Sequence, residues 1–171
     1  MCIIVDTNTL PSVFDKNSDN HAAFKDVLNW VYYGKGKLVY GGTKYKNELK
    51  KYLAIILEYR KAGKAVYVND ADVDAEAQRL ASLLQHPDFD DAHLVALLRV
   101  SGCRLICSLD SRAYPYFTHN MFFEGSSKKP KIYTGSRNKE LLADKYIVSI
   151  CLPCEKTTKN QRRKLPLTGK S

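Results

Sequence analysis

The chain has 171 residues, of which 44% are hydrophobic and 26% are charged, so it can bury the core of one compact domain and does not have the composition of a disordered chain. The 27 Lys and Arg residues outnumber the 18 Asp and Glu residues, and the net charge of +9 favours a polyanionic partner such as nucleic acid. The apolar run at residues 2–5 is too short for a secretory leader or a membrane span, so we expect a cytoplasmic protein that does not contact a membrane.

Strands alternating with helices are predicted along the chain, which is the pattern of a parallel sheet covered on both faces. Apolar runs predict strands over residues 2–5, 38–40, 65–68, 104–108 and 147–152. Apolar residues at helical spacing predict helices over residues 22–33, 45–62, 72–84 and 92–101, with a short one over 138–142. A loop is expected over residues 11–19. Segment 111–131 mixes aromatic residues with Pro and Gly and is expected to be a loop with short helical pieces, whose aromatic rings either stack on bases or, by default, pack in the core.

The basic residues are unevenly distributed. Residues 156–171 contain six Lys and Arg residues and no acid. We expect residues 1–153 to form the domain and residues 154–171 to form a basic, flexible tail, which either contacts phosphates or only adds solubility. A second basic stretch surrounds Glu48, where the alternatives are phosphate binding and a solvated helix face; its members are Lys44, Lys46, Lys50, Lys51, Arg60, Lys61 and Lys64.

Four carboxylates stand at the edges of predicted elements. Asp6 follows the first strand and Asp110 follows the fourth, and open α/β sheets place their chemistry at the carboxyl ends of parallel strands. Glu48 and Asp91 come from predicted helices. Because four acids in one place repel one another, such a cluster predicts a hard divalent cation, Mg²⁺ or Mn²⁺. Taken singly, each acid is better explained as a helix cap, a turn residue or the partner of a nearby lysine than as a metal ligand, and the prediction rests on the four together.

Four short stretches resemble, in order and spacing, the acidic motifs of PIN-domain ribonucleases. They are IVDTN at 4–8, NEL at 47–49, FDDAHLVAL at 89–97 and LICSLD at 105–110. The resemblance covers roughly residues 1–152 on an alternating strand and helix pattern. It implies a three-layer α/β/α fold with a central parallel sheet, and metal-dependent hydrolysis of phosphodiester bonds in RNA.

The resemblance also implies roles for individual residues. The expected catalytic residues and metal ligands are Asp6, Glu48, Asp91 and Asp110, with Glu48 either completing the metal shell or orienting the attacking water. Asp90 is an alternative to Asp91, because a shift of one residue is open, and Asp88 is a weaker third candidate.

Four further residues are candidates for binding substrate. Asn8 and Ser108 match small polar positions of the family, and both a substrate contact and ordinary hydrogen bonding at a strand end are open for them. Lys44 and Lys51 flank Glu48 and are expected to bind phosphate.

The five cysteines are an odd number in a chain with no predicted secretory leader, which favours reduced thiols over a disulfide framework. The alternative is a zinc site formed by Cys103, Cys107, Cys151 and Cys154, but core packing is favoured because Cys107 lies inside an apolar run. For His93, a packed or surface position is the default and a place in the cleft beside Asp91 is the alternative.

The sequence is best interpreted as a cytoplasmic endoribonuclease that depends on Mg²⁺ or Mn²⁺. It is either the toxin of a toxin and antitoxin pair or an RNA-processing or decay enzyme, although the segment from Ser111 and the basic tail are longer than in compact toxin members. The alternatives are a catalytically inactive PIN-like module that binds nucleic acid, and a DNA nuclease. RNA is the expected partner, and an antitoxin, another protein or a second copy of the chain are further candidates.

Overall fold

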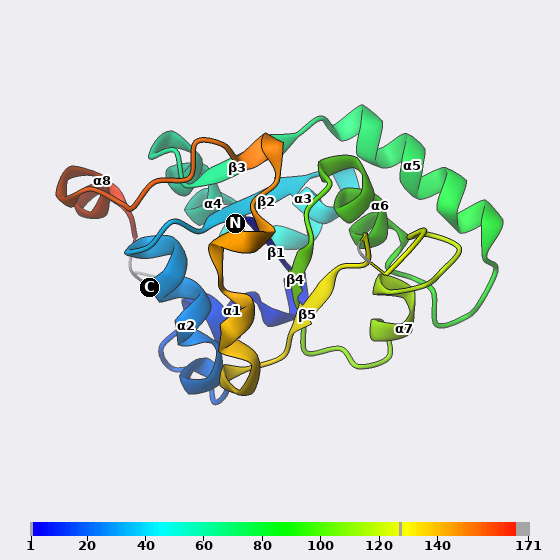
Figure 1. The fold of residues 1–171 in the computed structure, drawn as a ribbon, viewed down its shortest axis with the longest axis horizontal. Coiled ribbons are helices and arrows are strands. Elements are labelled where there is room, and N and C mark those ends of the chain that lie inside the picture. Colours follow the sequence, from blue (N-terminus) through cyan, green and yellow to red (C-terminus); the bar gives the residue numbers. More distant parts are fainter. Residues whose placement is uncertain (1, 127, 167–171) are drawn as a thin grey trace.

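The centre of the computed structural model is a five-stranded, wholly parallel sheet with strand order β3-β2-β1-β4-β5 (Figure 1). The structure describes residues 2–126 and 128–166. The strands are β1 (Cys2–Val5), β2 (Lys37–Gly41), β3 (Ala65–Val68), β4 (Leu105–Cys107) and β5 (Lys131–Tyr133). β1 and β4 are buried along their whole length, which fits their uninterrupted apolar sequences, because a strand covered on both faces presents no side chain to water. The expected α/β class with one parallel sheet is confirmed.

Helices connect the strands and cover the sheet. The α-helices are α1 (Leu10–Phe14), α2 (His21–Tyr32), α3 (Thr43–Leu49), α4 (Tyr52–Lys61), α5 (Asp70–Leu83), α6 (Ala92–Ser101), α7 (Tyr114–Phe117) and α8 (Lys159–Lys164). Short 3₁₀ helices are η1 (Thr7–Thr9), η2 (Ser136–Leu141), η3 (Asp144–Tyr146) and η4 (Ser149–Cys151). Helices expected over 22–33, 72–84 and 92–101 are present to within two residues.

The helices fall into two packing groups. The Phe14 ring of α1 contacts the Tyr59 ring of α4, with centroids 6.0 Å apart, and α1 packs on α2. α5 packs against α6, which contacts β2 and β3. In Figure 1 the pair α1 and α2 lies at the lower left of the sheet, and the pair α5 and α6 lies at the right. This arrangement is consistent with three α/β/α layers.

The single helix expected over residues 45–62 is interrupted, so that expectation is wrong. Lys50 stands between α3 and α4 with φ 49° and ψ −122°. Residues other than glycine rarely adopt this backbone conformation, and it ends the helix. The two helices have different partners: the Tyr45 hydroxyl of α3 donates to the Val5 carbonyl of β1 at 2.6 Å, whereas α4 packs beside α1 and β3. The break therefore lets α3 lie across the carboxyl end of β1.

The strand expected over residues 147–152 does not form, and the fifth strand is β5. The apolar residues Ile147, Val148 and Ile150 pack against the core without joining a ladder: Ile147 and Val148 form an extended link between two 3₁₀ turns, and Ile150 lies in the second turn. On β5, the side-chain amide of Asn138 donates to the Ile132 carbonyl at 2.9 Å. That contact occupies a backbone acceptor that a further strand on this edge would need.

Two loop expectations change in detail. The loop expected over 11–19 begins with helix α1, and Pro11 in its first turn is tolerated there because the first N–H groups of a helix have no intrahelical partner. In segment 111–131, Phe117, Phe122 and Phe123 are buried, so core packing accounts for these three rings.

The described part of the expected tail, residues 154–166, is docked on the domain, which does not fit a flexible tail. The buried Thr157 donates its hydroxyl to a carbonyl of α2 at 3.2 Å, and the Gln161 side chain donates to a carbonyl just after α4 at 2.7 Å. Leu165 is also buried. The rest of this segment, residues 167–171, lies outside the described residues.

Across the described ranges, we find no helix with the length and apolar character that crossing a bilayer requires.

Candidate active site

The strand order reverses between β1 and β4. From β1 the chain moves outward through β2 to β3, and then returns to place β4 on the other side of β1. In an open parallel sheet, the ligand crevice lies outside the carboxyl ends of the two strands at such a switch point. Asp6 directly follows β1, and Asp110 follows β4 after two residues. Both acids therefore stand at the position where the topology of the sheet favours chemistry.

Ser108 joins these two acids. Its hydroxyl donates to Asp6 Oδ2 at 2.7 Å and accepts from the Asp110 N–H at 3.1 Å. The Asn8 N–H donates to Asp6 Oδ1 at 3.3 Å. Burial raises the pKa of Asp6, the two hydrogen bonds oppose this, and the charges of Asp110 and Glu48 raise it further. The Asp6 carboxylate is therefore held in place but poorly compensated in charge.

Glu48 reaches the same site from α3. Its Oε2 atom accepts from the Thr7 hydroxyl at 3.3 Å and lies 3.0 Å from Nε2 of His93 on α6. Lys44, one helical turn earlier, places its ammonium 3.9 Å from Oε1. Two neutral groups and one cation thus orient the Glu48 carboxylate.

The His93 ring is buried, and burial disfavours its charged form. Burial lowers the pKa of His93, although the neighbouring Glu48 carboxylate acts in the opposite direction. A neutral imidazole that donates from Nε2 to Glu48 leaves Nδ1 as a bare acceptor, and within the described residues this Nδ1 atom has no hydrogen-bond partner. The default expectation of a packed histidine fits, but the packed ring is also a direct neighbour of a site acid.

Asp91 is the acid before α6 that shares the buried environment of the site. Burial raises its pKa to about 7, and the charges of Asp6 and Asp90 add to the shift, as does Glu48. Asp88 and Asp90 are exposed, whereas Asp91 is partly buried. Among the three candidates, only Asp91 thus combines burial with a pKa raised by Asp6.

Asp110 differs from the other acids because it has an ionic partner. The Arg112 guanidinium donates to both carboxylate oxygens, at 3.2 and 3.1 Å, and the Arg112 N–H donates to Oδ1 at 3.0 Å. These bonds hold the pKa of Asp110 below its usual range. In this conformation Asp110 lies at the rim of the site with its charge balanced.

The donor set fits a hard cation by chemical type, although the carboxylates are not gathered tightly. Within residues 2–126 and 128–166, no three acidic, histidine or cysteine side chains form a ready-made metal group. Carboxylate oxygens are nevertheless the ligands that Mg²⁺ and Mn²⁺ prefer. Like charges contribute to the raised pKa values of Asp6 and Asp91, and a nearby cation would lower both.

The four substrate candidates occupy different positions. Ser108 is fully buried and its hydroxyl is engaged with Asp6, so it supports the site from behind. The side chains of Asn8 and Lys44 are exposed at the rim, and Lys44 also donates to a backbone carbonyl of the loop before α6. Lys51 places its ammonium over the Tyr52 ring, 5.2 Å from the centroid, and no bond to the four acids is found for it in the described part of the chain.

The cysteines do not form a zinc site. Cys2 and Cys151 are joined in a disulfide with Cα atoms 6.2 Å apart, so the expectation of reduced thiols is wrong for this pair. Cys103 donates its thiol to the Cys2 carbonyl at the amino end of β1, whereas Cys107 lies at the carboxyl end of β4. The four thiols of the zinc alternative are thus divided between the two ends of the sheet, and Cys103 and Cys107 are buried in the core, as the favoured explanation had it.

Comparison with known proteins finds no relative: no family model, no curated protein and no solved structure matches the chain.

The sequence analysis did not single out Thr7 or Arg112, each of which contacts a candidate acid. Arg112 contacts Asp110, two residues earlier, so proximity in sequence was an available signal for Arg112. Thr7 contacts Glu48, 41 residues away in the chain, and no local signal marked that contact.

Proposed function

We propose that this chain is a metal-dependent endoribonuclease related to the PIN-domain family, with its active site at the switch point between β1 and β4. One observation carries the proposal: Asp6, Glu48 and Asp91 come from three separate elements that hydrogen bonds bring together at the carboxyl end of the sheet. Glu48 accepts from Thr7, the residue after Asp6, and Lys44 beside Glu48 donates to the carbonyl of Asp90, the residue before Asp91. Repulsion among buried acids costs stability, so its retention favours a functional role. The parallel sheet and the order of the acidic motifs along the chain support the same family.

Asp6, Asp91, Asp110 and Glu48 would hold the Mg²⁺ or Mn²⁺ ion. When bound, such an ion supplies charge relief to phosphoryl oxygens and a more acidic water. The protein residues orient this centre. Ser108 aligns Asp6, while Thr7 and His93 align Glu48, which would complete the metal shell or orient the attacking water.

The rim of the site can position a phosphodiester. Lys44 is exposed beside Glu48, and Arg112 is exposed beside Asp110. Two cations on either side of a group of carboxylates offset the repulsion between the acids and a phosphate backbone. Asn8 adds an exposed amide that can bond to a phosphate or a base.

The biological setting within this proposal is a cytoplasmic toxin neutralised by an antitoxin, or an RNA-processing enzyme. One observation favours a second candidate, an inactive module that only binds nucleic acid: the Arg112 ion pair satisfies Asp110, so one of the four acids is engaged. DNA remains the alternative substrate, because no contact in the site distinguishes a 2′-hydroxyl.

The deciding experiment is cleavage of a mixed pool of single-stranded and hairpin RNA with Mn²⁺, Mg²⁺ or EDTA. Wild-type protein is compared with Asp91→Asn, and Asp88→Asn serves as the matched control because Asp88 is an exposed acid in the same loop. We expect metal-dependent cutting that falls at least about 100-fold in Asp91→Asn and is unchanged in the control.

Two other outcomes would contradict the proposal. Cutting that persists in EDTA would rule out a metal-dependent reaction. RNA that is bound but never cut by wild-type protein would favour the inactive binding module.

A further inference from the structure

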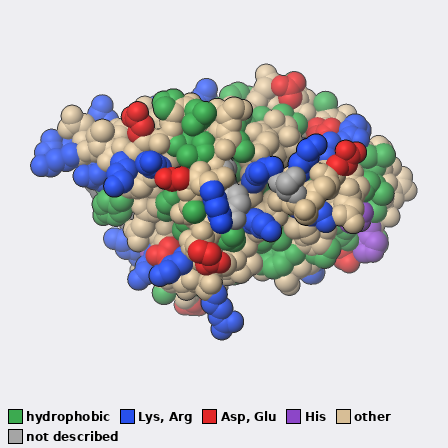
Figure 2. All heavy atoms as spheres, viewed as in Figure 1, with side chains coloured by type: hydrophobic (Ala, Val, Ile, Leu, Met, Phe, Trp, Pro, Cys, Tyr) green, Lys and Arg blue, Asp and Glu red, His purple; other side chains and the backbone are tan. Residues whose placement is uncertain are grey.

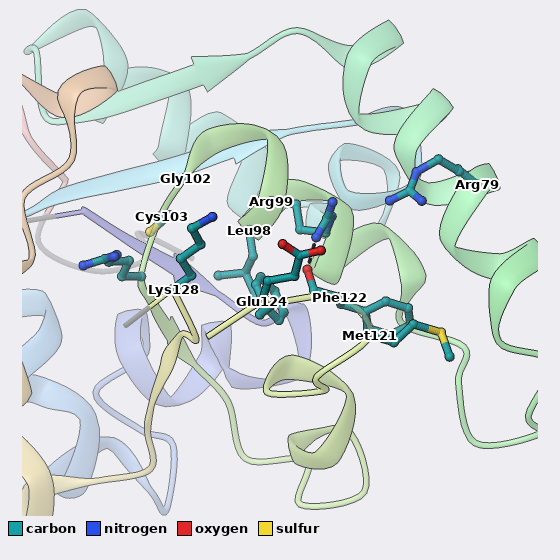
Figure 3. Close-up of a pocket in the computed structure, with 11 residues that line it drawn as sticks. Arg79, Leu98, Arg99, Gly102, Cys103, Met121, Phe122, Glu124 and Lys128 are labelled. Carbon is teal, nitrogen blue, oxygen red and sulfur yellow. Dashed lines mark hydrogen bonds between the residues drawn. The ribbon is translucent and has the colours of Figure 1, made fainter. Parts of the chain in front are cut away.

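A second concave surface lies at the opposite end of β4 from Asp110. It encloses about 560 Å³ and is lined by residues of α5, α6, the turn before β4 and the loop before β5. Figure 3 shows Arg79 at one end of this pocket, with Arg99, Glu124 and Lys128 further along it. A volume of this size is typical of ligand sites.

The floor of the pocket is apolar and closed. Leu98, Cys103, Phe122 and Phe123 line it, and none of these side chains is more than 6% exposed. A ligand therefore meets the polar side chains of the rim and not the hydrophobic core beneath it.

The rim is strongly basic. Its cations come from four separate segments of the chain: Arg79, Arg99, Arg104 and Lys128. Arg79 and Arg99 share the single carboxylate of Glu76, with N–O distances of 2.7 and 2.5 Å, so that pair keeps a net positive charge. In residues 2–126 and 128–166, no ion pair is found for Arg104 or Lys128, and Glu124 is the one acid of the lining.

The basic surface continues beyond the pocket. The Lys131 N–H donates to the Arg104 carbonyl at 2.8 Å, which places the exposed Lys131 next to the rim, and Lys129 lies between Lys128 and Lys131 in the chain. Figure 2 shows Lys and Arg side chains close together at the centre of this face. A basic strip longer than the pocket fits a linear polyanion better than a small one.

We propose that this pocket binds backbone phosphates of single-stranded RNA, as a second contact for the strand that is cut at the acid site. Guanidinium groups suit this task because their planar donors match phosphate oxygens in pairs. Arg104 directly precedes β4 and Asp110 follows it after two residues, and the six residue steps between them span at most about 20 Å in an extended chain. One short strand of RNA can therefore reach both sites. The inference rests on the proposed function for the identity of the polyanion.

Binding is measured separately from cleavage. All proteins carry Asp91→Asn and are kept in EDTA, so the probe remains intact. The probe is a fluorescent single-stranded RNA of about 12 nucleotides, and anisotropy gives its affinity over a series of salt concentrations. The test variant is Arg104→Gln with Lys128→Gln.

We expect the test variant to weaken binding about tenfold at low salt. The slope of log affinity against log salt should flatten by about 1.4, because each lost phosphate contact on a single strand removes about 0.7. The matched control is Lys35→Gln with Lys25→Gln, which makes the same charge change at two lysines on and just after α2, outside the pocket and outside the basic stretch around Glu48. The control should retain the wild-type slope.

Three results would overturn the inference. The first is an unchanged salt slope in the test variant. The second is an equal loss of RNA affinity in the control, which would mean that net charge alone causes the effect. The third is a pocket-dependent affinity for a free nucleoside triphosphate with no change in RNA binding.

The failure of this inference can be told apart from the failure of the proposed function. If the slope of log affinity against log salt is unchanged in the test variant while wild-type protein cuts RNA, only the assignment of the pocket as an RNA site is wrong. If wild-type protein does not cut RNA but the slope flattens in the test variant, the nuclease proposal falls and the pocket remains a nucleic-acid site.

Discussion

The two ends of the central sheet each bury an ionisable side chain, in different surroundings. Asp6, at the carboxyl end of β1, is 2% exposed and has other carboxylates near it. Lys64, just before the amino end of β3, is also 2% exposed, but its ammonium donates to the carbonyls of Gly34 at 2.9 Å and Glu155 at 3.3 Å. Several carboxylates act on Asp6, whereas Lys64 has two carbonyl acceptors together with the like charge of Lys37.

This difference marks Asp6 as part of a candidate functional site and Lys64 as a structural contact. Burial raises the pKa of Asp6 and lowers the pKa of Lys64 to about 8, so the charged form is disfavoured at both ends. At Asp6 the nearby acids increase that cost, which a bound cation would offset. At Lys64 the two carbonyls reduce it, and they belong to the loop after α2 and to the C-terminal segment, so Lys64 ties these segments together.

The largest effect is expected at the acid end. Asp6→Asn should reduce RNA cleavage at least about 100-fold, because it removes a carboxylate from the proposed metal centre. In EDTA the same variant should be as stable as wild type or more stable by about 1 kcal/mol, because repulsion among the acids is relieved. Cleavage assays and urea unfolding measure the two effects, with the exposed Asp19→Asn as control. A loss of stability in metal-free buffer would contradict the comparison.

Lys64→Met tests the amino end. The folded protein lowers the pKa of Lys64 from 10.5 to about 8, so between these values the unfolded chain binds more protons at this position. Wild-type stability should therefore rise with pH in that window relative to the variant, by at most about 3 kcal/mol. Below about pH 8 Lys64 is charged in the folded protein, so the free energy of unfolding of the wild type is reduced by the full cost of burying that charge. Urea unfolding of both proteins at about pH 7 and about pH 10 measures this, and parallel pH profiles would show that Lys64 is not buried as a strained charge.

The smallest effect concerns Lys50, which separates α3 at the acid end from α4. Lys50 has φ 49°, and glycine adopts this conformation without strain, so Lys50→Gly should raise the free energy of unfolding by about 1 kcal/mol. The neighbouring Lys51 has φ −60° and ψ −26°, which any residue adopts without strain, so Lys51→Gly should not raise the free energy of unfolding and serves as the matched control. Equal effects of the two variants would mean that the break between α3 and α4 is unstrained.

Elements with a strong local signal were predictable. The bounds of β1 and β3 match the expected strands, and α6 begins and ends where its pattern indicated, with Gly102 in the left-handed conformation at its C-terminal end. Apolar runs, helical spacing and a terminal glycine depend on neighbouring residues only. Sequence patterns are therefore sufficient for these elements.

Errors arose where a distant contact decided the outcome. The break at Lys50 follows from the separate partners of α3 and α4, and no breaker residue marks it in the sequence. The apolar run at 147–152 has the composition of a strand, but it covers the core as short extended pieces around a 3₁₀ turn, beside the disulfide between Cys2 and Cys151. Local composition does not distinguish a strand from another apolar segment that covers the core.

By itself, the sequence determined the alternation of strands and helices and the placing of acids at the ends of those elements, because both depend on short-range patterns along the chain. Only the tertiary structure decided that Asp91 and not its exposed neighbours shares the environment of Asp6, that His93 turns toward Glu48, and that Arg112 engages Asp110. It also assembled the basic pocket from four separate segments. Burial and the distances between charges depend on residues far apart in the chain, so they are settled only when the chain is folded.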